Sequence, residues 1–175
     1  MTQTRMSDLI DANIEDDRWT QIDLVALAET AARATLACVG LDAARCEITL
    51  LGCDDHRIAT LNGEFRDKPA PTNVLSWPGH EYCVDLPGER PRMANDIGPE
   101  SVLELGDIAI SFDTCEREAQ ATDKPLSAHV THLLVHGVLH LLGYDHISDP
   151  DAGLMERTEV EILASLGLDD PYSVN

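Results

Sequence analysis

Residues 125–146 read PLSAHVTHLLVHGVLHLLGYDH, and this segment predicts the central helix of the fold. Pro125 stands where proline favours the first turn of a helix, and Gly143 is the residue type that ends one, so we predict a helix from Pro125 to Leu142. Apolar residues occupy nearly all of its faces, which predicts a helix buried in the core. One stripe differs, because four histidines recur there at helical spacing: His129, His132, His136 and His140.

Three histidines of this stretch have the spacing of metal ligands. His136 and His140 lie one turn apart, about 6 Å, which one ion can bridge. Gly143 lets the chain turn back, so that His146 can add a third nitrogen. Three neutral imidazoles leave a fourth position open for water, as in catalytic zinc, which lowers the pKa of that water towards about 7. We predict one metal ion at these histidines, with zinc preferred, although imidazole also suits other divalent transition metals.

The spacing H-x3-H-x2-G-x2-H is also that of the metzincin metalloproteases, which carry a glutamate base directly after the first histidine. This chain has Gly137 at that position. Glycine cannot take a proton from water, so the comparison supports a metal site and disfavours peptide hydrolysis. A phosphodiester is an alternative substrate, especially if its own ribose 2′-hydroxyl attacks, because that reaction needs a cation on the phosphate more than a carboxylate base.

Outside the histidine stretch, the pattern predicts strands early and helices late, which favours the α+β class. We expect strands at 9–14, 46–51, 72–77 and 105–112. Helices are expected from about 22 to 39, from the Asp54-Asp55 cap to about 65, from an Asp113 cap to about 123, and from Pro150 onwards. Residues 79–100 lack periodicity, so we expect a long loop or insertion there.

Length and charge limit the number of domains and the classes of function that the chain can have. The chain has 175 residues, which predicts a single domain spanning 1–175. Its formal net charge of −20 disfavours nucleic-acid binding through a broad basic face but is compatible with a local cationic site. The sequence shows no secretory signal and no apolar run of the ~20 residues that span a bilayer, so we expect a cytoplasmic protein. Five scattered cysteines are expected to be reduced.

Four segments together resemble the YbeY family of bacterial single-strand-specific endoribonucleases. They are HGVLHLLGYDH at 136–146, LGDIAIS at 105–111, LNGEFRDKPAPTNVLSWP at 61–78 and MERTEVEIL at 155–163. The resemblance covers the chain from about Ile48 to Gly167. It implies a mixed four-stranded sheet packed by helices, and a role in ribosomal RNA processing, including maturation of the 16S 3′ end, and in ribosome quality control. The implied partners are single-stranded or ribosomal RNA, a small-subunit ribosomal protein and a ribosome-assembly GTPase.

The resemblance also assigns residues. It implies that His136, His140 and His146 are the zinc ligands and that Arg66 engages the RNA phosphate, which suits the planar fork of a guanidinium. Without it, a solvated Arg66, or one paired with Glu64 or Asp67, would be the simpler interpretation. The family usually has aspartate where this chain has Asn73, which puts any ion pair or metal contact through that carboxylate in doubt.

Several alternatives stay open at this point. His132 either supports the metal ligands or lines the core, and Asp145 either orients an imidazole or caps the loop. Arg90 and Arg92 either help to hold RNA or belong to a solvated loop. For the whole chain, the alternatives are a metal-dependent hydrolase with another substrate and a ribosome-assembly factor whose zinc is structural.

Overall fold

The predicted strands assemble into one sheet in the computed structural model, which describes residues 8–93 and 101–173. Its strands are β1 (Ile10–Ile14), β2 (Cys46–Cys53), β3 (Val74–Pro78) and β6 (Leu103–Ser111), in the order β1-β2-β6-β3. β1, β2 and β6 run parallel, and β3 pairs antiparallel with β6 along the edge. This mixed four-stranded sheet confirms the expectation drawn from the resemblance.

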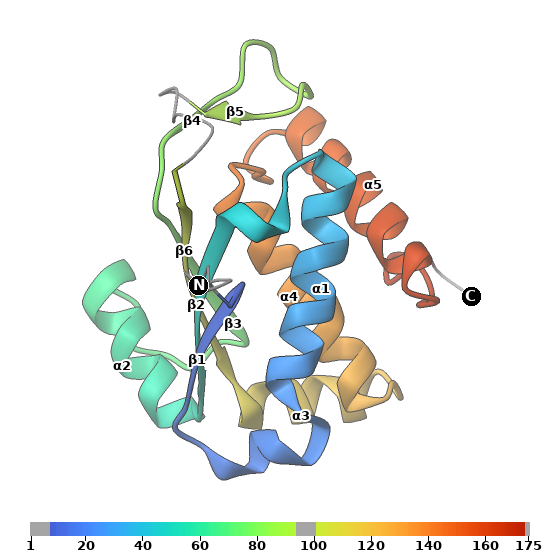
Figure 1. Cartoon of the computed structure of the whole chain (residues 1–175). Helices are drawn as coiled ribbons and strands as arrows, with labels where there is room; N and C mark the ends of the chain where they lie inside the picture. Colours follow the sequence, from blue (N-terminus) through green and yellow to red (C-terminus); the bar gives the residue numbers. More distant parts are fainter. Residues whose placement is uncertain (1–7, 94–100, 174–175) are drawn as a thin grey trace, which may run out of the picture.

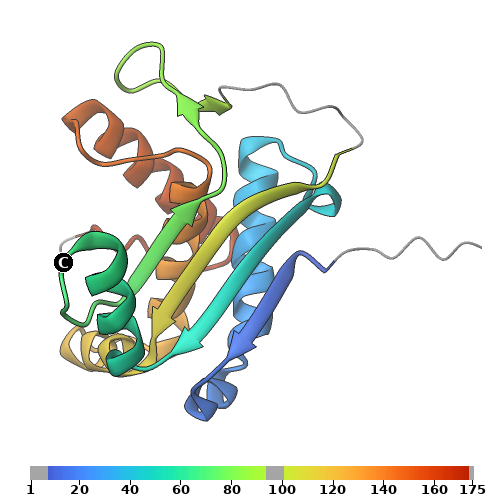
Figure 2. The same cartoon turned by 90° about the vertical axis from the view of Figure 1, so that its left-hand side faces the viewer.

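The helices cover the sheet unequally. α1 (Leu24–Val39), α4 (Leu126–Leu141) and α5 (Asp149–Ser165) lie on one face, and α3 (Phe112–Ala121) packs beside α4. α2 (Asp55–Arg66) lies alone on the other face, as Figures 1 and 2 show. The arrangement confirms the α+β class, and it leaves the edge strand β3 between α2 and α4, where the candidate site forms.

α4 is the central helix, as its sequence predicts. It contacts α1, α3, α5 and the strands β3 and β6. Nine of its residues are buried, and they surround the histidine stripe on the remaining faces: Val130, Thr131, Leu133, Leu134, Val135, Gly137, Val138, Leu139 and Leu141. Burial on this scale anchors the helix by the hydrophobic effect, so its histidines stand on a rigid support.

Several local details differ from the prediction. Asp17–Ile22 forms a 3-10 helix (η1), so α1 begins at Leu24, and a second short one (η2) spans Ala43–Arg45. The expected cap at Asp113 is wrong, because Ser111 precedes α3 and Asp113 lies in its first turn. Asp54 does cap α2, accepting from the backbone N–H of Arg57.

The expected loop at 79–100 contains a small hairpin. β4 (Tyr82–Cys83) pairs antiparallel with β5 (Arg92–Met93). The backbone N–H of Gly88, in the hairpin loop, donates to Asp151 of α5 over 2.8 Å. Residues 94–100 of the expected loop lie outside the described residues. In the described part of the chain, no helix is both long and apolar enough to cross a membrane.

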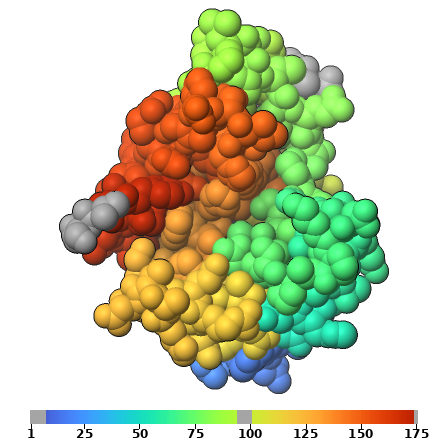
Figure 3. Space-filling model, turned by 180° about the vertical axis from the view of Figure 1, so that it is seen from behind, coloured from blue at the N-terminus to red at the C-terminus, as the bar shows by residue number. Residues whose placement is uncertain are grey.

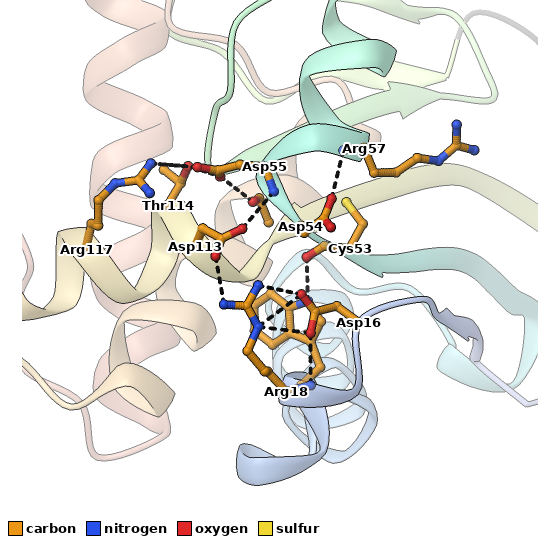
Figure 4. A network of polar contacts seen from close by, with 11 residues as sticks. Asp16, Arg18, Cys53, Asp54, Asp55, Arg57, Asp113, Thr114 and Arg117 are labelled. Atoms are coloured by element: carbon orange, nitrogen blue, oxygen red, sulfur yellow. Dashed lines mark hydrogen bonds and ion pairs between the residues drawn. The ribbon is translucent and has the colours of Figure 1, made fainter.

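A polar network fixes the end of α2 that lies far from the site (Figure 4). Asp55 accepts hydrogen bonds from Ser111 and Thr114, both over 2.6 Å, and pairs with Arg117. Its backbone N–H donates to Asp113, which in turn pairs with Arg18 of η1. These contacts tie the N-terminus of α2 to α3 and thereby help to set the direction of the helix whose last residue is Arg66.

Candidate metal centre

Three histidines converge as the sequence predicts. His136 and His140 lie on α4, and His146 follows the turn after it. One ring nitrogen from each lies within 4.8 Å of those of the other two. The ring centroid of His140 lies 4.5 Å from that of His136 and 5.1 Å from that of His146. The three rings therefore face one small volume.

The turn after α4 brings His146 back to the helix. Gly143 adopts φ +91°, a left-handed conformation, and a Cβ there would lie 2.5 Å from the ring of Tyr82. Tyr144 N–H donates to the Leu139 carbonyl over 3.1 Å, which closes the reversal. A glycine is thus required at this position for both backbone and space.

Each α4 ligand is oriented through its second nitrogen. His136 Nδ1 lies 2.5 Å from Glu159 Oε1, and His140 Nδ1 lies 2.9 Å from the Tyr144 carbonyl oxygen. An ionised carboxylate and a carbonyl only accept, so both rings make these bonds with a proton on Nδ1. Histidines that bind metals are commonly oriented in this way.

The remaining nitrogens fit a cation. His136 Nε2 and His140 Nε2 face each other at 3.0 Å. Burial, followed by repulsion from His136, lowers the pKa of His140 to about 4, so its ring is neutral near pH 7. Two facing lone pairs repel unless a positive charge lies between them. Tetrahedral zinc holds two nitrogens about 3.3 Å apart, close to this spacing. The donor set therefore suits a metal ion such as zinc.

Glu159 is the residue of the centre that sequence reasoning missed. Its side chain is 0% exposed and accepts from His136, from His132 and from the Tyr172 hydroxyl. Burial alone raises the pKa of this carboxyl, but the three hydrogen bonds outweigh it and lower the pKa to about 2. The available signal was an acidic residue on the buried stripe of α5, which otherwise holds Met155, Thr158, Ile162 and Leu163.

A cleft of about 820 Å³ opens in front of the histidines. Arg66 at the end of α2, Ser76 of β3 and the turn at 143–147 line it together with the three rings. In the space-filling view from behind, α4 lies recessed between the green α2–β3 segment and the red-orange α5 (Figure 3). Arg66 thus shares one concave surface with the metal centre.

In the described structure, Arg66 does not form the ion pair with Glu64 or Asp67 that the sequence left open. It is exposed, and its Nη2 donates to the Ser76 carbonyl oxygen over 3.4 Å. No ion pair links it to Glu64, Asp67 or any other carboxylate among the described residues. Its guanidinium is therefore available to an anionic ligand in the cleft.

The other residues considered from the sequence each have identifiable contacts. Asp145 accepts from the backbone N–H of His146 over 2.7 Å, so it caps the loop. His132 contacts Glu159 over 3.2 Å, the carboxylate that also contacts His136. Arg92 pairs with Asp85 inside the hairpin.

Asn73 has a partner that explains its amide. Its Nδ2 donates to Glu118 over 3.0 Å, and Glu118 also contacts His129 over 3.0 Å. An aspartate at this position would repel that carboxylate. The amide here therefore serves a hydrogen bond between the residue that precedes β3 and α3.

Gly137 lies on the face of α4 that packs on the sheet. A Cβ there would meet Ile108 Cδ1 at 3.2 Å and Ser76 Oγ at 3.3 Å. A glutamate at this position would therefore enter the packed core between helix and sheet. The close packing of helix and sheet therefore explains why position 137 lacks the metzincin glutamate. This packing argument stands beside the argument from the chemistry of peptide hydrolysis.

Comparisons with known proteins agree along nearly the whole chain. The family model described as Endoribonuclease YbeY matches residues 10–167. A protein named Endoribonuclease YbeY from Ruegeria pomeroyi is 58% identical over 94% of this chain and 98% of its own length. One of the same name from Cereibacter sphaeroides is 54% identical over 95% of this chain and 100% of its own. The solution structure of TM1509 from Thermotoga maritima shares the fold, with a TM-score of 0.53 at 19% identity, covering 94% of this chain and 99% of that one.

Proposed function

Because the chain belongs to the Endoribonuclease YbeY family, we propose that it is a zinc-dependent endoribonuclease that cleaves single-stranded RNA. The observation that carries this proposal is one cleft that holds three convergent histidines and an arginine with no carboxylate partner among the described residues. Such a pair of features suits a phosphodiester, because cationic groups stabilise the charge that develops on its oxygens during cleavage.

Each residue has a role in this proposal. His136, His140 and His146 hold the zinc, and Arg66 binds the phosphate and neutralises charge that develops on it. A metal ion held by these histidines would supply Lewis acidity to a phosphate in the cleft. Since position 137 offers no base to activate a water molecule, the nucleophile we propose is the ribose 2′-hydroxyl of the substrate. It attacks the phosphorus, its proton passes to solvent water, and the 5′-oxygen leaves.

The cellular role follows from the family. We propose that the substrate is ribosomal RNA, with maturation of the 16S 3′ end and ribosome quality control as the processes served. A small-subunit ribosomal protein and a ribosome-assembly GTPase are the proposed partners, and the cytoplasm is the proposed location. The net charge of −20 makes delivery by a partner useful, because it repels RNA at long range.

Metal reconstitution tests the proposal. The chelated protein should stay folded, fail to cut single-stranded RNA, and recover cleavage as zinc is added up to one ion per chain. The His140→Ala variant should recover no cleavage over the same titration. Unfolding on chelation would favour the assembly factor with structural zinc. Casein hydrolysis that depends on zinc, without RNA cleavage, would favour the hydrolase with another substrate.

A further inference from the structure

The three proposed ligands are oriented by different means. His140 is held by the backbone carbonyl of Tyr144, which no side-chain substitution removes. His146 is exposed, and its ring makes no hydrogen bond within the described residues. Only His136 depends on a side chain from another helix, namely Glu159 of α5, which lies 23 residues away in the sequence.

Glu159 is itself held on both oxygens. Oε1 accepts from His136, while Oε2 accepts from His132 Nε2 over 3.2 Å and from the Tyr172 hydroxyl. A carboxylate that is 0% exposed needs such compensation, since an unpaired buried charge costs several kcal/mol. The donors fix the plane of the carboxylate and, through it, the ring of His136.

Tyr172 reaches this carboxylate from the segment beyond α5. The chain leaves α5 through Gly167, which adopts φ +77°, and folds back against α4. The ring of Tyr172 meets that of His132 edge to face, with centroids 5.8 Å apart. Its hydroxyl therefore connects the C-terminal segment to the metal centre through two hydrogen bonds in series.

We propose that Glu159 is a positioning residue for His136, and that Tyr172 holds Glu159 in place, so that the C-terminal segment helps to set metal affinity. This inference rests on the proposed function, because it needs a metal at the three histidines. The carboxylate keeps the His136 proton on Nδ1 and makes Nε2 a better ligand, through orientation and through its negative charge.

Metal affinity measured apart from catalysis tests this role. Zinc dissociation constants are determined by competition with a coloured chelator for the wild type, Glu159→Gln, Tyr172→Phe and Glu161→Gln. Glu161 is an exposed glutamate on the same helix and serves as the matched control. The thermal unfolding of each metal-free protein and the visible spectrum of its cobalt form are recorded on the same samples.

We expect Glu159→Gln to weaken zinc binding by about 10- to 100-fold and to alter the cobalt spectrum. Tyr172→Phe should weaken it by about two- to tenfold, the value of one hydrogen bond. Glu161→Gln should match the wild type. A purely structural role instead predicts a lower melting temperature of the metal-free protein with an unchanged dissociation constant, and that result overturns the inference.

Three further outcomes distinguish a failure of the positioning role from a failure of the proposed function. If Glu159→Gln does not fold, Tyr172→Phe decides, because it leaves the carboxylate in place: zinc affinity equal to that of Glu161→Gln overturns the inference. If the wild type itself binds no zinc, the proposed function fails. If the wild type binds zinc and cuts RNA while Glu159→Gln binds zinc equally well, only the positioning role fails.

Discussion

At the scale of single residues, the site depends on close packing behind the histidine helix. Gly137 sits between His136 and the next turn, where its hydrogen faces Ile108 and Ser76. The absence of a side chain lets α4 approach β3 and β6, and this approach places His136 and His140 along the cleft. Helical glycine costs about 1 kcal/mol relative to alanine, so the packing must compensate for it.

This packing predicts what happens when the glutamate of the metzincins is introduced at position 137. Gly137→Glu should destabilise the fold by at least about 3 kcal/mol, because it overpacks the core and buries a carboxylate there. It should confer no casein hydrolysis. Gly153→Glu is the matched control, since a Cβ there meets only the flexible end of Arg157, at 3.1 Å, and should be neutral or stabilising. Urea unfolding measures both, and a stable Gly137→Glu variant with protease activity would refute this account of the glycine.

At the scale of elements, α2 matters because it presents Arg66 at one end and is tied down at the other. Hydrogen bonds from Arg18 lower the pKa values of Asp16 and Asp113 below the usual 3.8. For Asp55, burial raises the pKa, but hydrogen bonds from Ser111, Thr114 and Arg117 outweigh it and the net shift is downward. These carboxylates contribute stability only while they are ionised.

Lowering the pH should therefore destabilise the folded protein through these carboxylates. With folded pKa values below the unfolded value of about 3.8, the contribution is complete above about pH 5 and is lost as the pH falls through the folded values. Asp55→Asn should lower stability at pH 7 by about 1–3 kcal/mol and flatten its decline below pH 4. Asp11→Asn, at an exposed position on β1, is the control. Urea unfolding from pH 7 to 3 gives both slopes, and parallel curves for Asp55→Asn and wild type would contradict this role of the network.

The sequence predicts the elements better than their connections. Strand and helix positions follow from periodicity, and the histidine spacing alone places three rings together. Glu159 escapes such reasoning because its partners, His136 and Tyr172, come from different parts of the chain and meet only after folding. The hairpin at 82–93 escapes it because two-residue strands leave no periodic signal.

At the scale of the whole molecule, charge sets how RNA can bind. The formal net charge is −20, and several arginines are paired with carboxylates, among them Arg18, Arg33, Arg92 and Arg117. Arg66 is the cation that lines the cleft among the described residues. RNA binding is therefore expected to rest on few phosphate contacts rather than on a basic face.

Salt dependence reports the number of those contacts. For single strands the logarithm of affinity falls with that of salt concentration by about 0.7 per neutralised phosphate. One or two contacts predict a slope no steeper than about −1.5, read from fluorescence anisotropy of a labelled, uncleavable 2′-O-methyl RNA. Arg66→Ala should make the slope shallower, whereas the conservative Arg66→Lys should retain it. A slope steeper than about −3 in the wild type would indicate a broad cationic surface instead.

Metal content and cleavage of single-stranded RNA, measured on the same samples of three purified proteins, test whether the histidine cleft is the nuclease site. We expect the wild type to carry one zinc per chain and to cut, and His140→Ala to lose both zinc and cleavage. Arg66→Ala should keep its zinc but lose cleavage, because the guanidinium acts on the phosphate and not on the metal. Equal cutting by all three proteins would contradict the assignment of this cleft as the nuclease site.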